Sequence, residues 1–170
     1  MQSITHKEMA DMLYNLIKSE DGFKIEYPDC MMMVLWSGVV PAVAVKTIYE
    51  SVSEEAPIIP IQALRIKNKI VDGGRIIEVG GFLDEDNGVL ELTSTGKRYH
   101  HMIIVDDVID TGETIRKAIE VAKNYADVIS VLSVCGSTMF TNIEEIDGAK
   151  IYICKFGVLE DIGFGWNERN

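Results

Sequence analysis

The 170-residue sequence contains few cysteines, few prolines and few basic residues. Its three cysteines are odd in number, show no C-x-x-C spacing and lie in apolar runs, so we expect reduced core residues rather than disulfides, zinc ligands or nucleophiles: Cys30, Cys135 and Cys154. The sequence has 16 Lys and Arg residues and 27 Asp and Glu residues, which gives a formal net charge of -11. This excess of acid argues against nucleic acid or an acidic membrane surface as a partner.

Long apolar runs are also missing from the sequence. The longest are too short to span a membrane, and the N-terminus lacks the basic region and apolar stretch of a secretory signal. We therefore expect a cytoplasmic protein. There is no internal repeat or Pro/Ser-rich linker, and 47% of the residues are hydrophobic, so we expect residues 1–170 to form one domain with a substantial core.

Strand patterns alternate with helix patterns along the chain. Thr5 and Glu8 have the spacing of a capping box, followed by a one-sided apolar helix to about Ser19. Further helices are indicated at 42–54, from 111 onward and, weakly, at 142–146, and strands at 30–36, 58–66, 76–79, 89–92, 102–105, 128–134 and 150–156. This alternation predicts an α/β fold with a largely parallel sheet flanked by helices.

The most informative segment is 101–116, where a strand, three carboxylates and a hydroxyl-rich turn precede a helix. Residues 102–105 form an apolar run that ends in Asp106 and Asp107, at the end of a strand where α/β proteins place their chemistry. The helix that follows exposes free backbone N–H groups, which suit a phosphate. Gly112 allows close approach of an anion, and Thr111 and Thr114 add hydroxyl donors. The segment predicts a sugar-phosphate site.

The string IIVDDVIDTGET, residues 103–114, resembles the signature of type I phosphoribosyltransferases, which use 5-phosphoribosyl-1-pyrophosphate (PRPP). The resemblance implies that Asp106 and Asp107 hold the ribose hydroxyls, directly or as ligands of Mg²⁺. Ionised carboxylates suit both tasks, since they accept strong hydrogen bonds and bind hard cations. The resemblance also implies a set of residues around the 5-phosphate: Asp110, Thr111, Gly112, Glu113 and Thr114. Asp110 matches an aspartate of purine salvage enzymes that lies beside the base, which implies a catalytic, proton-handling role.

A second segment, MMMVLWSGVVPA at 31–42, resembles the pyrophosphate-binding loop of the same family. On this register Trp36 takes the place of a basic residue and Ser37 that of a glycine, while Gly38 matches a glycine of the family's loop. We expect all three to contact substrate, largely through backbone N–H groups. Trp36 supplies no charge to a pyrophosphate, and a buried aromatic residue at a strand end is the alternative interpretation.

The family implies transfer of ribose 5-phosphate from PRPP to a nucleobase, with release of pyrophosphate and with Mg²⁺ as cofactor, and the match of Asp110 to purine salvage enzymes indicates a purine. It also implies a small hood built from the N- and C-terminal segments, a homodimer or homotetramer, and binding of a nucleobase or nucleoside monophosphate. Residues 67–75, whose charges and paired glycines indicate a mobile turn, belong to the segment 67–81, which lies where the family keeps a closing loop. Its cations would face the pyrophosphate, or simply face solvent: Lys67, Lys69 and Arg75.

Other interpretations stay open at this point. Purine enzymes carry a lysine where this chain has Cys135, and Phe156, Phe164 and Trp166 are either base-stacking or core residues. A non-catalytic regulatory protein that senses PRPP or a nucleotide is therefore the alternative function. A phosphoacceptor receiver domain fits poorly, because its acid pair belongs near the start of the domain. An ordinary helix cap at Asp110 or Thr111 would leave the preceding acid pair unexplained.

Overall fold

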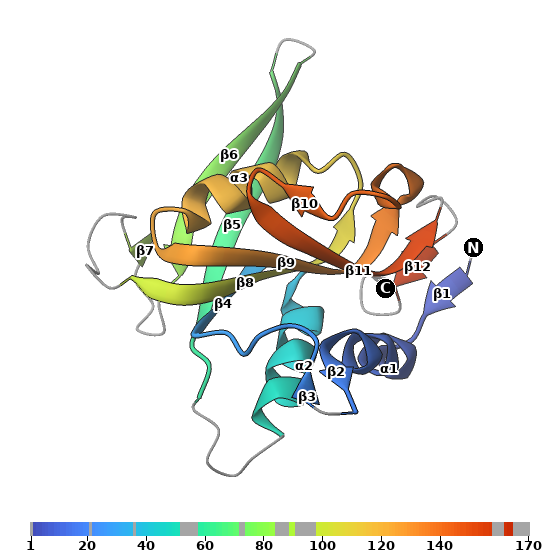
Figure 1. Ribbon diagram of the computed structural model, residues 1–170. Helices are drawn as coiled ribbons and strands as arrows, with labels where there is room; N and C mark the ends of the chain where they lie inside the picture. Colours follow the sequence, from blue (N-terminus) through green and yellow to red (C-terminus); the bar gives the residue numbers. More distant parts are fainter. Residues whose placement is uncertain are drawn as a thin grey trace.

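The computed structural model describes residues 2–20, 22–35, 37–51, 58–71, 74–83, 89–90, 98–157 and 162–164 (Figure 1). Its helices are α1 (His6–Ile17), α2 (Val39–Glu50), α3 (Glu113–Ala122) and the 3₁₀ helix η1 (Thr138–Phe140). Its strands are β1 (Gln2–Ile4), β2 (Lys18–Ser19), β3 (Gly22–Phe23), β4 (Cys30–Leu35), β5 (Ile61–Val71), β6 (Gly74–Leu83), β7 (Val89–Leu90), β8 (Tyr99–Ile109), β9 (Ala126–Ser137), β10 (Glu145–Ile146), β11 (Ala149–Gly157) and β12 (Ile162–Phe164).

Eight strands form one sheet in the order β10-β11-β9-β8-β4-β5-β6-β7. The five central strands, β11, β9, β8, β4 and β5, run parallel, and β10, β6 and β7 join antiparallel at the two sides. The predicted α/β fold with a largely parallel sheet is therefore confirmed. Because β4 pairs directly with β8, the turn that follows β4 lies beside the acidic end of β8.

Helices cover both faces of the sheet, with α3 on one face and α1 and α2 on the other (Figure 1). The helix predicted from residue 111 onward corresponds to α3, and its apolar side chains are buried as expected: Ile115, Ala118, Ile119 and Ala122. Burial of this stripe holds α3 on β8 and β9, which fixes where the first turn of the helix lies.

Helix α1 begins with the predicted capping box. The Thr5 hydroxyl accepts a hydrogen bond from the Glu8 backbone N–H at 3.2 Å, and the Thr5 N–H donates to the Glu8 carboxylate at 2.8 Å. The helix ends at Ile17, two residues before the expected Ser19, because residues 18–19 pair with 22–23 as the short hairpin β2–β3.

Two expectations about loops and helices are wrong. The predicted mobile turn over 67–75 is mostly strand, because β5 continues to Val71 and β6 begins at Gly74, and the two pair as a long antiparallel hairpin. The weak helix expected at 142–146 is replaced by η1 and the strand β10. A tight turn at Asp147 (φ 50°) and Gly148 (φ 84°) pairs β10 with β11, and positive φ at both positions is typical of a two-residue hairpin turn.

The two ends of the described chain lie side by side, since β1 pairs in parallel with β12 (Figure 1). This small sheet joins the N- and C-terminal segments from which we expected a hood to be built. Cys30 and Cys135 are buried, Cys154 is half-buried and all three are free thiols, as predicted. Within the described ranges, no helix is long and apolar enough to cross a membrane.

Candidate functional site

The acid pair lies inside β8 rather than beyond its end. Asp106 and Asp107 are only 4% and 5% exposed, because pairing with β9 continues past them to Ile109. Burial raises the pKa of Asp106 well above its ordinary value, and the adjacent charge of Asp107 raises it further. Two hydrogen bonds oppose this shift, both to Asp106 Oδ1: one from the Asp107 N–H at 2.9 Å and one from the Ser37 hydroxyl at 3.2 Å.

In the turn between β8 and α3 the N-cap residue offers no side-chain hydrogen bond to the start of the helix, and the Glu113 N–H donates to the Thr111 hydroxyl at 3.5 Å. Asp110 and Thr111 are exposed, and the residue at the N-cap position is Gly112, so the alternative that Asp110 or Thr111 is an ordinary N-cap is wrong. Gly112 has φ 79°, a conformation that side chains disfavour, and a Cβ there would lie 2.9 Å from Cζ of Phe140. A glycine is thus required for this turn, which leaves the start of α3 open to an anion.

The turn after β4 is held tightly against two strands. A Cβ on Gly38 would lie 2.6 Å from the carbonyl oxygens of both Val34 and Val105, so only glycine allows this approach. The Gly38 N–H donates to Val34 O at 2.9 Å, and α2 starts at the next residue. Trp36, expected to bind substrate, lies outside the described residues.

A cavity of about 230 Å³ joins the two turns. Seven of the predicted site residues line it: Ser37, Asp106, Asp107, Asp110, Thr111, Gly112 and Thr114. Gly38 lies beside it as part of the packed turn. The sequence interpretation missed Ile66 of β5, which also lines the cavity; the only signal was that an apolar strand ends near this residue. The structure therefore brings the sugar-phosphate motif and the second loop together around one hollow.

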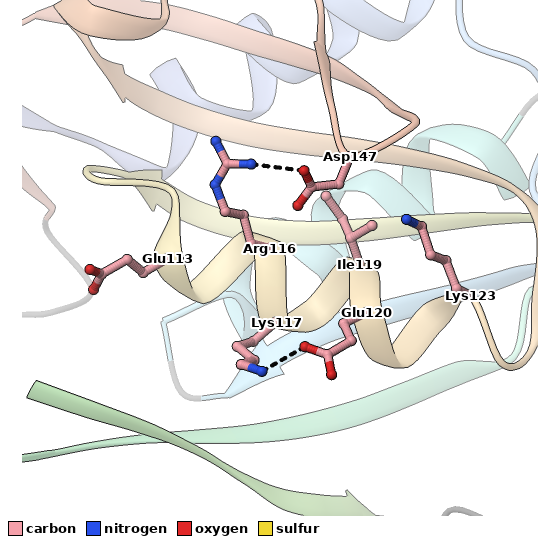
Figure 2. Close-up of a pocket in the computed structure, with 7 residues that line it drawn as sticks. All are labelled: Glu113, Arg116, Lys117, Ile119, Glu120, Lys123 and Asp147. Carbon is pink, nitrogen blue, oxygen red and sulfur yellow. Dashed lines mark hydrogen bonds and ion pairs between the residues drawn. The ribbon is translucent and has the colours of Figure 1, made fainter.

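Glu113 is the predicted site residue whose side chain lies elsewhere. It lines a separate, larger groove of about 710 Å³ on the outer side of α3 (Figure 2). The charges along this groove pair with one another, Arg116 with Asp147 at 2.9 Å and Lys117 with Glu120 at 2.6 Å. The Glu113 side chain therefore lines this groove and not the cavity, and its backbone N–H donates to the Thr111 hydroxyl at 3.5 Å.

The acid pair fits a hard cation in its chemistry but supplies only part of a coordination shell. Carboxylate oxygens are the ligands that Mg²⁺ prefers, and a cation would offset the repulsion between two adjacent buried acids. In the described part of the chain, no cluster of three or more His, Cys, Asp or Glu side chains is placed to hold a metal. A Mg²⁺ ion at Asp106 and Asp107 would therefore take its other ligands from a bound phosphate compound and water.

The end of β9 has no cation of its own. Burial raises the pKa of Cys135 to about 11, so its thiol stays neutral near pH 7, and a Cβ on Gly136 would lie 2.6 Å from Ile153 Cδ1. The register places Lys155 of β11 opposite Cys135. Phe164 is buried and Phe156 is 38% exposed, whereas Trp166 lies outside the described residues.

Comparison with known proteins identifies the fold. No family model and no curated protein matches the sequence. A purine phosphoribosyltransferase from Pyrococcus horikoshii is 21% identical with a TM-score of 0.64, over 100% of this chain and 97% of that one. A hypothetical protein from Neisseria gonorrhoeae with bound ppGpp is 18% identical with a TM-score of 0.66, over 100% and 92%.

An orotate phosphoribosyltransferase from Aeropyrum pernix is more distant, with 17% identity and a TM-score of 0.52 over 89% of this chain and 71% of that one. These similarities span enzymes for purine and pyrimidine bases. The chain therefore has the type I phosphoribosyltransferase fold, and the solved structures that share it include several purine enzymes.

Proposed function

We propose that the protein is a phosphoribosyltransferase that transfers the ribose 5-phosphate of PRPP to a nucleobase, a purine, and releases pyrophosphate. The observation that carries this proposal is the single cavity between the start of α3, the buried acid pair and the glycine-packed turn after β4. The start of α3 suits a phosphate, the acid pair suits a sugar with free hydroxyls, and the turn after β4 suits a second phosphate group.

Each part of the site has a separate task in this reaction. The backbone of 110–114, with the Thr111 and Thr114 hydroxyls, holds the 5-phosphate. Asp106 and Asp107 hold the ribose hydroxyls, and the turn at Ser37 and Gly38 holds the pyrophosphate. With the sugar fixed at both ends, a ring nitrogen of the base attacks the anomeric carbon as pyrophosphate leaves.

Proton transfer and charge neutralisation complete the proposal. Asp110 is exposed at the mouth of the cavity and accepts the proton of the attacking ring nitrogen. Asp106 and Asp107 would hold Mg²⁺, which when bound would supply electrostatic neutralisation of the pyrophosphate. Lys155, opposite Cys135, is the cation nearest in register to the position where purine enzymes carry a lysine.

The test is an assay of pyrophosphate release with PRPP, Mg²⁺ and a panel of purine and pyrimidine bases. We expect release with at least one base, and a loss of at least about 100-fold in the Asp106→Asn, Asp107→Asn double variant, since both sugar contacts are removed. The Ser133→Ala variant is the matched control, because Ser133 is buried in β9 beside Asp106 but donates to Cys135 O. Equal activity in wild type and the double variant would refute the assignment.

A non-catalytic sensor of PRPP or a nucleotide is the second candidate. Its support is the similarity to a protein with bound ppGpp and the lack of a cation at Cys135 in β9. Tight binding of PRPP or ppGpp without pyrophosphate release for any base would favour this candidate over the enzyme.

Self-association and location belong to the same proposal. The resemblance to the family supports a homodimer or homotetramer, and we place the protein in the cytoplasm. Sedimentation analysis of the purified chain tests the first, since a monomer at micromolar concentration would contradict it.

A further inference from the structure

Ser37 makes a contact that its place in the turn after β4 does not require. Its hydroxyl donates to Asp106 Oδ1 at 3.2 Å, across 69 residues of sequence. The same oxygen accepts the Asp107 N–H at 2.9 Å. Two donors on one oxygen fix the orientation of the carboxyl group, because rotation about the side chain would break both hydrogen bonds.

The backbone around Ser37 cannot move away from this contact. Gly38 is wedged between the carbonyl oxygens of Val34 and Val105, and Val105 directly precedes Asp106 in β8. Two consecutive residues of the turn therefore meet two consecutive residues of β8. The distance from Ser37 to Asp106 is set by this packing and not by the ligand.

Asp106 also needs such a donor. It is 4% exposed and lies next to a second carboxyl group, so its charged form has little solvent to stabilise it. With a glycine or alanine at position 37, Asp106 Oδ1 would keep the Asp107 N–H and lose the Ser37 hydroxyl as a donor. The hydroxyl thus controls both the orientation and the charge stabilisation of the carboxyl group.

We infer that Ser37 is a positioning residue that acts on the sugar through Asp106 rather than on the pyrophosphate directly. This inference rests on the proposed function. It assigns to the Ser37 side chain a role distinct from the backbone contacts of the loop, and it makes the affinity for ribose-containing ligands depend on the hydroxyl.

Titration calorimetry with Mg²⁺ and three ligands tests the inference: PRPP, ribose 5-phosphate and inorganic pyrophosphate. We expect Ser37→Ala and Ser37→Gly to weaken PRPP binding about tenfold, the scale of one hydrogen bond to a charged group. Ribose 5-phosphate should weaken similarly, while the affinity for pyrophosphate stays within about twofold of wild type. Ser37→Thr keeps the hydroxyl and should restore PRPP binding to within about threefold.

A double-mutant cycle with Asp106→Ala, which removes the acceptor of the Ser37 hydroxyl, separates positioning from direct contact. If Ser37 acts through Asp106, adding Ser37→Ala to Asp106→Ala should cost less than about twofold in PRPP affinity. Additive losses, or an equal loss of pyrophosphate binding, would overturn the inference while leaving the proposed function intact. If the wild-type chain binds no PRPP at all, the proposed function fails and the inference fails with it.

Discussion

Gly112 and Gly148 offer a matched pair of substitutions that separates backbone strain from crowding. Both have a left-handed conformation, with φ 79° and 84°, but a Cβ at Gly148 meets nothing within 4 Å, whereas one at Gly112 lies 2.9 Å from Phe140 Cζ. Alanine in this conformation costs about 1–2 kcal/mol. Gly148→Ala should therefore lower Tm by roughly 2–8 °C in a chain of this size.

Gly112→Ala carries the same strain and must also displace Phe140, which adds about 1–3 kcal/mol. Its Tm should fall further, by roughly 4–20 °C in total. The shift also moves the start of α3, so we expect PRPP affinity to fall at least about tenfold, while Gly148→Ala keeps the wild-type value. Thermal unfolding and calorimetry measure both effects. Equal Tm values and equal affinities for the two variants would refute the reasoning.

Three further predictions concern buried acid, buried histidine and the first helix. Burial raises the pKa of Asp106, so its stabilising contribution is present below the unfolded value and is lost as pH rises through the folded pKa. Asp106→Asn should therefore raise the free energy of unfolding at pH 7 by about 1–3 kcal/mol in metal-free buffer. The control Asp110→Asn, at an exposed position, should change it by less than about 0.5 kcal/mol. An Asp106→Asn variant less stable than wild type would contradict this prediction. Burial lowers the pKa of His101, so the free energy of unfolding should fall as pH drops below 6.5 toward the folded pKa. Urea unfolding of His101→Gln should show a flatter dependence of this free energy on pH. An unchanged pH dependence would exclude His101 as the cause. Thr5→Ala should cost about 0.5–2 kcal/mol in thermal unfolding, because the capping box is lost; an unchanged Tm would show that the cap contributes nothing.

The features that the sequence predicted correctly are mainly local ones. The capping box at Thr5 depends on residues three apart, and the buried stripe of α3 depends on helical periodicity, so both are visible in a short window. The largely parallel sheet followed from the alternation of strand and helix patterns, whereas the order of its strands did not. Gly112 has a positive φ, which fits a glycine at this turn, while its contact with an anion stays a prediction.

The features that the sequence could not predict depend on contacts between distant segments. The depth at which Asp106 lies reflects continued pairing of β8 with β9, and the hydrogen bond from Ser37 spans two strands. The β5–β6 hairpin was interpreted as a turn because its charges and glycines dominate the local pattern, although β5 continues to Val71 and β6 begins at Gly74. Trp36, Trp166 and the positions 72–73 lie outside the described residues.

The strand order has a consequence for how the protein acquires its cavity during folding. β4 precedes β5 and β8 in the sequence but lies between them in the sheet, so both of its neighbours are synthesised after it. The two walls of the cavity therefore meet only after the central parallel pairing is complete, a non-local step that is intrinsically slow. A nascent chain that ends before β8 has half a binding site, so ligand binding in a refolding experiment would report the final assembly of the sheet rather than any earlier collapse.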